Sequence, residues 1–276
     1  MELRGFLRFK TGKVFEQTNG CAVIRHSGWA KCRCVMLVEV FRGAAHEVRR
    51  TARTMFLLGI DTCGPSGSVA LGRLTGMLSA ELIAQRELEG RSYSATLIAA
   101  VEELLRKNAT SLGSIGCLVV VNGPGSFTGV RVGLSAVKGL AEGTGVPVVA
   151  VSRLEVLARK AGVLSAALDA HRHEVFLRVA DCDLKVRELL AGATDLAGIT
   201  PCSRIAVCDE AAAALLGEAW PDAGLMRVPA PTAADALTVA APEIAAGEFA
   251  DVALLDGHYL RRSDAEIFGA HKTALT

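Results

Sequence analysis

Two aspartates stand where an apolar run gives way to a turn. Asp61 follows the run FLLGI, and Asp169 follows the run SAAL. A carboxylate at such a place can hold a metal–phosphate complex, while the N–H groups of the turn cradle the phosphate. The alternative is an Asx turn, in which the aspartate accepts a hydrogen bond from the backbone and stabilises the hairpin. Spacing alone favours the second interpretation.

A glycine-rich turn offers a second possible anion site. The apolar run 117–121 suits a strand buried on both faces, and residues 127–142 then read as a helix capped by Ser126. N–H groups at a helix N-terminus favour an anion, which Arg131 in the first turn could also reach. The spacing matches neither a dinucleotide fingerprint nor a Walker A loop, so a tight turn that packs helix on strand is favoured. The candidate residues here are Gly123, Pro124, Gly125, Ser126, Phe127, Thr128, Gly129 and Arg131.

Metal binding and nucleophilic catalysis receive less support. His171 and His173 lie between Asp169 and Glu174, a set that could ligate a metal, but the sequence shows no further ligand. Ser126 is not in a Gly-x-Ser-x-Gly elbow, because the run is one residue too long. We therefore predict no metal site and no catalytic residue, and we keep Asp61, Thr62, Asp169 and Glu174 as candidate cleft-lining residues.

The elements that would position these residues form two similar units. In residues 55–163 the pattern predicts three strands and then alternating helices and strands, which indicates a mixed sheet with helices on its faces. In residues 164–276 the order strand, Asp, turn, strand recurs, and we interpret it as an internal repeat. The predicted strands are 56–61, 68–72, 77–84, 117–121, 147–151, 164–170, 174–181 and 205–208, and the predicted helices are 92–108, 127–142, 152–160, 211–216 and 233–246.

Composition limits the class of protein. The chain has 276 residues, of which 51% are hydrophobic, and a net charge of +1, so it has ample apolar content for a core and no overall basic character for nucleic acid. Its eight cysteines are scattered without zinc spacing, which favours a reduced, cytoplasmic protein. No apolar run approaches the ~20 residues that span a bilayer.

Residues 1–54 differ from the rest of the chain. They hold eleven Lys and Arg against four Asp and Glu. A basic arm for RNA, a transit peptide and an upstream artefact of the chosen start codon are three interpretations. The clean strand directly after Met55 favours the third.

Four stretches carry a resemblance to a known family. They are MFLLGIDT at 55–62, GPGSFTGVRVGLSAVKGLAEGTGVPVVAVSRLEVLA at 123–158, AALDAHRHEVF at 166–176 and YLRRSDAE at 259–266. Together they resemble the TsaB (YeaZ) family, which belongs with the TsaD-like, glycoprotease-like (peptidase M22-like) proteins. The resemblance covers residues 55–266. It implies a duplicated α/β fold of the actin-like, ribonuclease H-like (ASKHA) type, with two lobes and a cleft between them.

The resemblance also implies a role in a complex. Members of this family take part in the synthesis of N6-threonylcarbamoyladenosine at A37 of tRNA, as non-catalytic partners that bind and activate TsaD. It implies the ATPase TsaE as a further partner, pairing with a second copy as a homodimer, and contact with tRNA only through the complex. No cofactor of its own is expected, although ATP or ADP could lie at the complex interface. The family pairs helices of its first lobe with the partner, which makes Leu97, Val101, Leu104, Val130 and Leu134 candidate interface residues.

The same resemblance speaks against independent catalysis. Positions that hold metal ligands in TsaD fall here on Arg153 and Leu157, and neither side chain can ligate a metal. Two other positions depart from the family pattern, with Tyr93 where a His is common and His171 where an Arg is common. An independent ATP-dependent kinase or phosphatase of the same fold, or less favourably a peptidase, remains the alternative.

Overall fold

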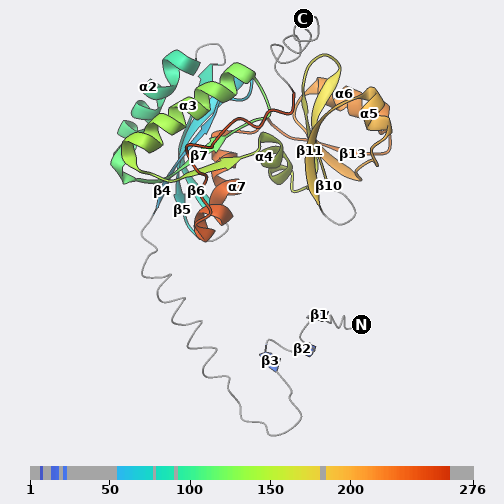
Figure 1. Ribbon diagram of the computed structural model, residues 1–276, viewed down its shortest axis with the longest axis horizontal. Coiled ribbons are helices and arrows are strands. Elements are labelled where there is room, and N and C mark those ends of the chain that lie inside the picture. Colours follow the sequence, from blue (N-terminus) through green and yellow to red (C-terminus); the bar gives the residue numbers. More distant parts are fainter. Residues whose placement is uncertain are drawn as a thin grey trace, which may run out of the picture. The chain divides into compact units, whose positions relative to one another are not determined.

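A computed structural model of the chain (Figure 1) divides it into two units, Met1–Arg53 and Thr54–Thr276. In the first unit three short strands form an antiparallel sheet: β1 (Leu7–Arg8), β2 (Val14–Thr18) and β3 (Cys21–Val23). Predictions for the rest of 1–54, for Arg91 and Ser92, and for the tail after Arg261 lie outside the described residues. The structure describes 55–76, 79–89, 93–180 and 185–261, together with the backbone of 7–8, 14–18 and 21–23.

The first lobe of the second unit is built on a five-stranded mixed sheet. The strand order is β6-β5-β4-β7-β8, in which β4, β5 and β6 are antiparallel neighbours and β4, β7 and β8 run parallel. The central strands are covered on both faces, which is why β4 and β7 are nearly continuous apolar runs. The strands are β4 (Phe56–Asp61), β5 (Ser66–Leu74), β6 (Ala80–Glu89), β7 (Ile115–Val121) and β8 (Val148–Val151).

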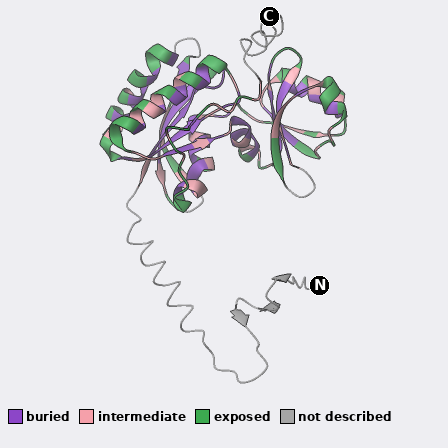
Figure 2. Ribbon diagram, viewed as in Figure 1, coloured by how far each residue is buried: buried purple, intermediate pink, exposed green. Residues whose placement is uncertain are grey.

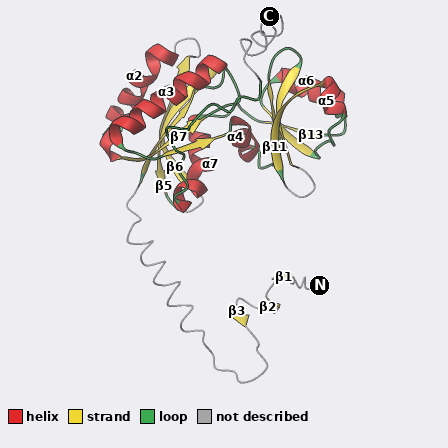
Figure 3. Ribbon diagram, in the orientation of Figure 1, coloured by secondary structure: helices red, strands yellow, loops and turns green. Residues whose placement is uncertain are grey.

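The second lobe repeats this topology. Its sheet has the order β11-β10-β9-β12-β13, so in each sheet the third, second, first, fourth and fifth strands of the unit lie side by side. The antiparallel and parallel pairings also correspond. This repeat confirms the predicted duplicated α/β fold of the actin-like, ribonuclease H-like type (Figure 3). The strands are β9 (Ala166–Asp169), β10 (Glu174–Ala180), β11 (Val186–Gly192), β12 (Arg204–Val207) and β13 (Gly224–Arg227).

Helices cover both faces of each sheet, and two of them cross between the lobes. On the first sheet α2 and α3 lie on one face, and α7 contacts all five strands from the other (Figure 1). On the second sheet α5 and α6 lie on one face, while α4 contacts β9, β10 and β12. A division at 163/164 therefore separates the sheets, but α4 and α7 each pack on the sheet of the other half. The helices are α2 (Tyr93–Lys107), α3 (Phe127–Thr144), α4 (Arg153–Lys160), α5 (Ala193–Ala197), α6 (Glu210–Ala219) and α7 (Ala233–Ala246), with a 3-10 turn η1 (Leu112–Ser114).

The strand period of two explains how the second sheet is covered. Neighbouring residues of β9 point to opposite faces: Ala167 packs with α5 and α6, while Ala166 and Leu168 pack with Leu154 and Leu157 of α4. Figure 2 shows buried residues along the strands of both sheets. Two separate apolar clusters thus hold the helices on either side of one sheet.

The sequence pattern located most of the elements. Helices 92–108, 127–142 and 233–246 are confirmed within two residues at each end, and Ser126 and Ser152 cap α3 and α4 as predicted. The third strand is β6 at Ala80–Glu89 rather than 77–84. Three elements of the second lobe were not predicted: β11, α5 and β13. Among the described residues no helix has the length and apolar character needed to cross a bilayer.

Candidate functional site

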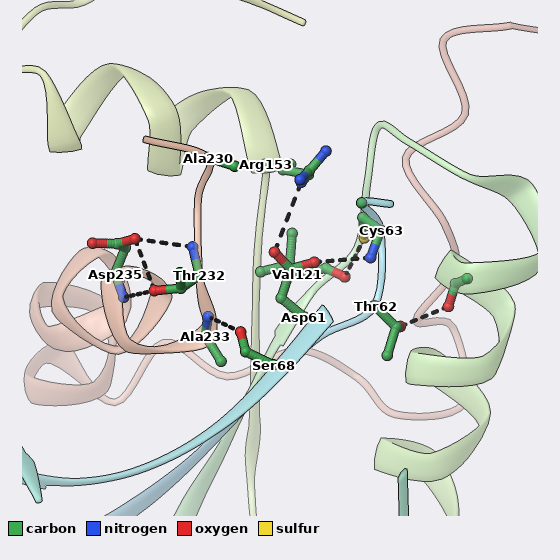
Figure 4. A network of polar contacts seen from close by, with 12 residues as sticks. Asp61, Thr62, Cys63, Ser68, Val121, Arg153, Ala230, Thr232, Ala233 and Asp235 are labelled. Atoms are coloured by element: carbon green, nitrogen blue, oxygen red, sulfur yellow. Dashed lines mark hydrogen bonds and ion pairs between the residues drawn. The ribbon is translucent and has the colours of Figure 1, made fainter. Parts of the chain in front are cut away.

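Asp61 ends β4 and is buried, with 1% of its surface exposed. One carboxylate oxygen, Oδ1, accepts a hydrogen bond from the backbone N–H of Cys63 at 2.8 Å, which is an Asx turn. The other, Oδ2, lies 3.7 Å from Nε of Arg153 (Figure 4). Burial raises the pKa of Asp61, and Arg153 and the Cys63 N–H oppose that rise. The carboxylate that could have held a metal–phosphate complex is paired within the chain.

Arg153, the first residue of α4, is itself 6% exposed. Its guanidinium lies against Gly64, where a Cβ atom would collide with Nη2, so only glycine leaves room for it in the turn after Asp61. The Nε atom of Arg153 has no hydrogen-bond partner among the described residues. The buried guanidinium of Arg153 thus provides a positive charge beside the Asp61 carboxylate.

The turn after Asp61 packs closely beneath α3. Thr62 Oγ1 donates a hydrogen bond to the carbonyl of Gly129 at 2.7 Å, and a Cβ at Gly129 would collide with the carbonyl oxygen of Thr62. A Cβ at Gly125 would likewise collide with the carbonyl of Cys63. The spacing of these glycines therefore follows from the close approach of helix and turn.

The N-terminus of α3 has protein partners for several of its donors. The N–H of Ser126 donates to Cys63 O at 2.8 Å, and Ser126 Oγ accepts from the N–H of Gly129 at 3.3 Å. Gly123, Pro124 and Gly125 lie directly before this cap, and Arg153 N–H donates to Gly123 O at 2.6 Å. These contacts are those of a turn that packs helix on strand, the alternative that spacing favoured.

Asp169, the equivalent residue of the second lobe, lies in a more open place. Its Oδ1 accepts from the N–H of His171 at 2.7 Å, and its Oδ2 lies 2.9 Å from His171 Nδ1. The exposed residues His171, Arg172 and His173 all have left-handed backbones, with φ of 59°, 58° and 60°. In the part of the chain that the structure describes, no group of three or more His, Cys, Asp or Glu residues is arranged to hold a metal.

A polar cluster around Glu188 was not predicted from the sequence. Ser152 Oγ donates to both carboxylate oxygens of Glu188, at 2.9 and 2.7 Å, and Arg178 Nη1 donates to Oε1 at 2.6 Å. His258 Nε2 lies 2.8 Å from Oε2. Burial alone would raise the pKa of Glu188, but the hydrogen bonds from His258, Ser152 and Arg178 bring it below its ordinary value. The cluster joins the end of β8 to the second sheet.

Nothing in the sequence links these partners. Glu188 lies on β11, a strand that the pattern did not indicate, and it is 36 residues from Ser152 and 70 from His258. The available signal was that an acid with apolar neighbours on a strand needs a cationic partner.

The C-terminal segment contacts both halves of the predicted site. The N–H of His258 donates to Asn122 O at 2.7 Å, next to the glycine turn. Arg261 Nη2 pairs with Glu174 and donates to His171 O at 3.4 Å. The predicted site residues therefore form two groups: Asp61, Thr62 and the 123–131 turn on the first lobe, and Asp169 with Glu174 on the second. Residues 258–261 contact both groups.

A groove runs between α2 and α3. Its volume is about 570 Å³, and among its lining residues Ile98 is 52% and Phe127 37% exposed. The guanidinium of Arg131 lies over the Phe127 ring, 3.8 Å from its centroid. The five predicted interface residues are all buried in the core of the first lobe: Leu97, Val101, Leu104, Val130 and Leu134. Of these five, Leu97 alone also lines the groove. Ile98 and Phe127 are therefore the large apolar side chains that this groove exposes.

Comparison with known proteins shows which proteins this chain resembles. A family model for TsaD, tRNA N6-adenosine threonylcarbamoyltransferase, matches residues 77–194. The chain is 38% identical over 128 residues to the tRNA threonylcarbamoyladenosine biosynthesis protein TsaB of Escherichia coli (strain K12), which covers 44% of this chain and 53% of that protein. The Bacillus subtilis (strain 168) protein of the same name is 35% identical over 126 residues, covering 44% and 53%. The chain thus spans about half the length of the curated relatives it matches.

Solved structures agree with the sequence relatives. YeaZ from Pseudomonas aeruginosa superposes with a TM-score of 0.58 at 25% identity. The match covers 75% of this chain and 100% of the YeaZ chain. A second structure, an uncharacterized protein with similarity to peptidase YEAZ from Pseudomonas aeruginosa, gives 0.60 at 26% identity, again covering 75% and 100%. The chain is therefore similar to the TsaD-like family. Within it, the chain is similar to the proteins named TsaB or YeaZ.

The two residues at the positions of the TsaD metal ligands, Arg153 and Leu157, have other contacts in this chain. Arg153 is paired with Asp61, and Leu157 is fully buried in the apolar cluster between α4 and the second sheet. Tyr93, one of the departures from the family pattern, donates from its hydroxyl to Gly64 O at 2.9 Å. Burial raises the pKa of Tyr93 to about 12, so the hydroxyl stays a donor at neutral pH.

Proposed function

We propose that this chain is a non-catalytic subunit of the machinery that makes N6-threonylcarbamoyladenosine in tRNA, and that it binds and activates TsaD. The proposal is supported by relatives named for this biosynthesis at 34–38% identity and by the match to the TsaD family model. Because those matches span about half of the relatives, the partner and the reaction are proposals for this chain.

The surroundings of Asp61 support a non-catalytic role. A catalytic or nucleotide-binding carboxylate at this turn would need access to its ligand. Here Asp61 is buried, Arg153 stands beside it, and the Ser126 N–H is bonded to Cys63 O. The same contacts make an independent kinase or phosphatase the weaker alternative, and the burial of Leu157 makes a metallopeptidase weaker still.

The α2–α3 groove is the observation that carries the proposed partner. Single exposed apolar side chains are common on protein surfaces, but here two of them, Ile98 and Phe127, line one groove between α2 and α3. An amphipathic helix pair of TsaD could insert apolar side chains there. In the absence of TsaD the same surface could pair two copies of this chain. TsaE and its ATP or ADP would then bind the assembled pair, and tRNA would meet this chain only within the complex.

The test is complex formation with the TsaD of the same cell. Ile98→Glu places a charge in the groove without touching the core, and Leu164→Glu is a matched control because Leu164 is 50% exposed outside the groove. We expect I98E to lose at least tenfold in affinity for TsaD and to lose stimulation of tRNA modification in a reconstituted assay, while L164E keeps both. Wild-type affinity and stimulation in I98E would contradict docking in this groove.

A further inference from the structure

Residues 257–261 follow α7 and cross from the first lobe to the second without regular structure of their own. Three side chains of this segment make contacts in different directions. His258 reaches Glu188 at 2.8 Å, Tyr259 packs on Phe127, and Arg261 pairs with Glu174. We name residues 257–261 the C-terminal strap.

Tyr259 contacts the rim of the α2–α3 groove. Its ring centroid lies 4.9 Å from that of Phe127, with the planes tilted by 43°. Arg131 covers the same Phe127 ring at 3.8 Å. Phe127 and Arg131 both line the groove, whereas Tyr259 does not. Tyr259 can therefore influence the groove only through Phe127. The Phe127 ring is held in place by two neighbours, Tyr259 and Arg131.

The strap is fixed on both sides of Tyr259. Before it, the His258 N–H donates to Asn122 O at 2.7 Å, and the His258 ring bonds the largely buried Glu188. After it, Arg261 is bound to Glu174 and to His171 O. With both neighbours anchored, the Tyr259 ring has little freedom to leave Phe127.

We propose that Tyr259 is a positioning residue for partner binding: it holds Phe127 in the orientation that TsaD meets at the rim of the α2–α3 groove. This inference rests on the proposed function, since it concerns the same docking surface. It adds that the second lobe takes part in docking through the strap, although it lines none of the groove. The occupant is TsaD rather than a second copy, because the relatives of this chain are named TsaB for the biosynthesis of threonylcarbamoyladenosine in tRNA, and TsaD is the transferase of that modification.

The experiment measures TsaD affinity for full-length variants. Tyr259→Ala should weaken binding about fivefold, and Tyr259→Phe should restore it because the aromatic contact is kept. In a Phe127→Ala background Tyr259→Ala should have no further effect, which a general loss of stability would not produce. Leu254→Ala is the control, because Leu254 is 80% exposed in the preceding turn.

Each other outcome overturns a distinct claim. If I98E abolishes binding but Y259A binds as wild type, the strap inference fails and the groove stands. If I98E itself binds normally, the proposed docking surface fails. If Y259A weakens self-association in light scattering but leaves TsaD affinity unchanged, the inferred occupant is wrong, because the strap then serves a homodimer.

Discussion

The two strand–Asp–turn–strand units are built alike but lie in different surroundings. In each, the aspartate accepts a hydrogen bond from the N–H two residues later, at 2.8 Å for Asp61 and 2.7 Å for Asp169. The first turn is sealed between α3 and Arg153, and the side chain of Asp61 is 1% exposed. The second turn is open, and the side chain of Asp169 is 27% exposed. The same local motif therefore serves as a buried ion pair in one lobe and a surface turn in the other.

This difference shows what the motif itself contributes. The turn of such a hairpin has a backbone N–H that needs a hydrogen-bond acceptor. In both lobes the aspartate at the start of the turn supplies that acceptor. Whether the remaining carboxylate oxygen is available for chemistry depends on distant residues, here Arg153, which lies 92 positions after Asp61.

The largest expected effect is at Arg153. Arg153→Met leaves the buried Asp61 without its cation, and we expect a loss of about 3 kcal/mol in unfolding free energy at neutral pH. Urea denaturation measures it, with Arg159→Met on the exposed side of the same helix as control. The double variant Arg153→Met/Asp61→Asn should recover most of the loss, because no buried charge is then left unpaired.

The pH dependence of that variant has a definite sign. The folded-state pKa of Asp61 is raised, so its contribution to stability is present below the unfolded-state pKa and is lost as pH rises through the folded value. Arg153 lowers that pKa, so removing it raises the pKa further. Arg153→Met should therefore be more destabilised at pH 8 than at pH 5. A loss that does not change with pH would mean that Arg153 contributes through packing alone.

Residues near each other in sequence were predictable, and pairs brought together by the fold were not. The α2 and α3 helices, both serine caps and the repeated aspartate turn follow from spacing and residue type within short windows. Strand β11 was missed because VRELLAG alternates poorly and its acid, Glu188, points to a cluster made by Ser152, Arg178 and His258. The crossing of α4 and α7 between the sheets has no local signal either.

The interface residues illustrate the same limit. Helical periodicity identifies an apolar face, and Leu97, Val101 and Leu104 share it. Only the packing of α2 against β5, β6 and α3 shows that these three side chains are turned inward, and that Ile98, which belongs to the same apolar pattern, is the large apolar residue of α2 left exposed. Sequence periodicity thus finds the apolar face of a helix, but it does not show which residues of that face stay exposed.

An intermediate effect is expected at Glu188, where the lobes are joined. Its folded-state pKa lies below the ordinary value of 4.5, so its contribution to stability is present above that value and is lost as pH falls through the folded one. Glu188→Gln should cost about 2 kcal/mol at pH 7 because charge-assisted hydrogen bonds weaken. The difference from wild type should shrink below pH ~4.5. Glu218→Gln, on the exposed side of α6, is the control, and a difference that persists unchanged at low pH would contradict the role of the charge.

The smallest effect is expected at Asp169, and it tests the comparison directly. Asp169→Ala removes the turn acceptor for the His171 N–H, but water can reach this turn and replace it. We therefore expect a loss of about 1 kcal/mol or less in unfolding free energy. Asp61→Ala, the matched change in the first lobe, removes the same kind of hydrogen bond and also leaves Arg153 as a buried cation without a partner, so about 3 kcal/mol is expected. Equal losses for the two alanine variants would show that the shared Asx turn, rather than burial and Arg153, determines what these aspartates contribute. A threefold larger loss at Asp61 would assign the excess to the ion pair, since the hydrogen bond to the turn is common to both.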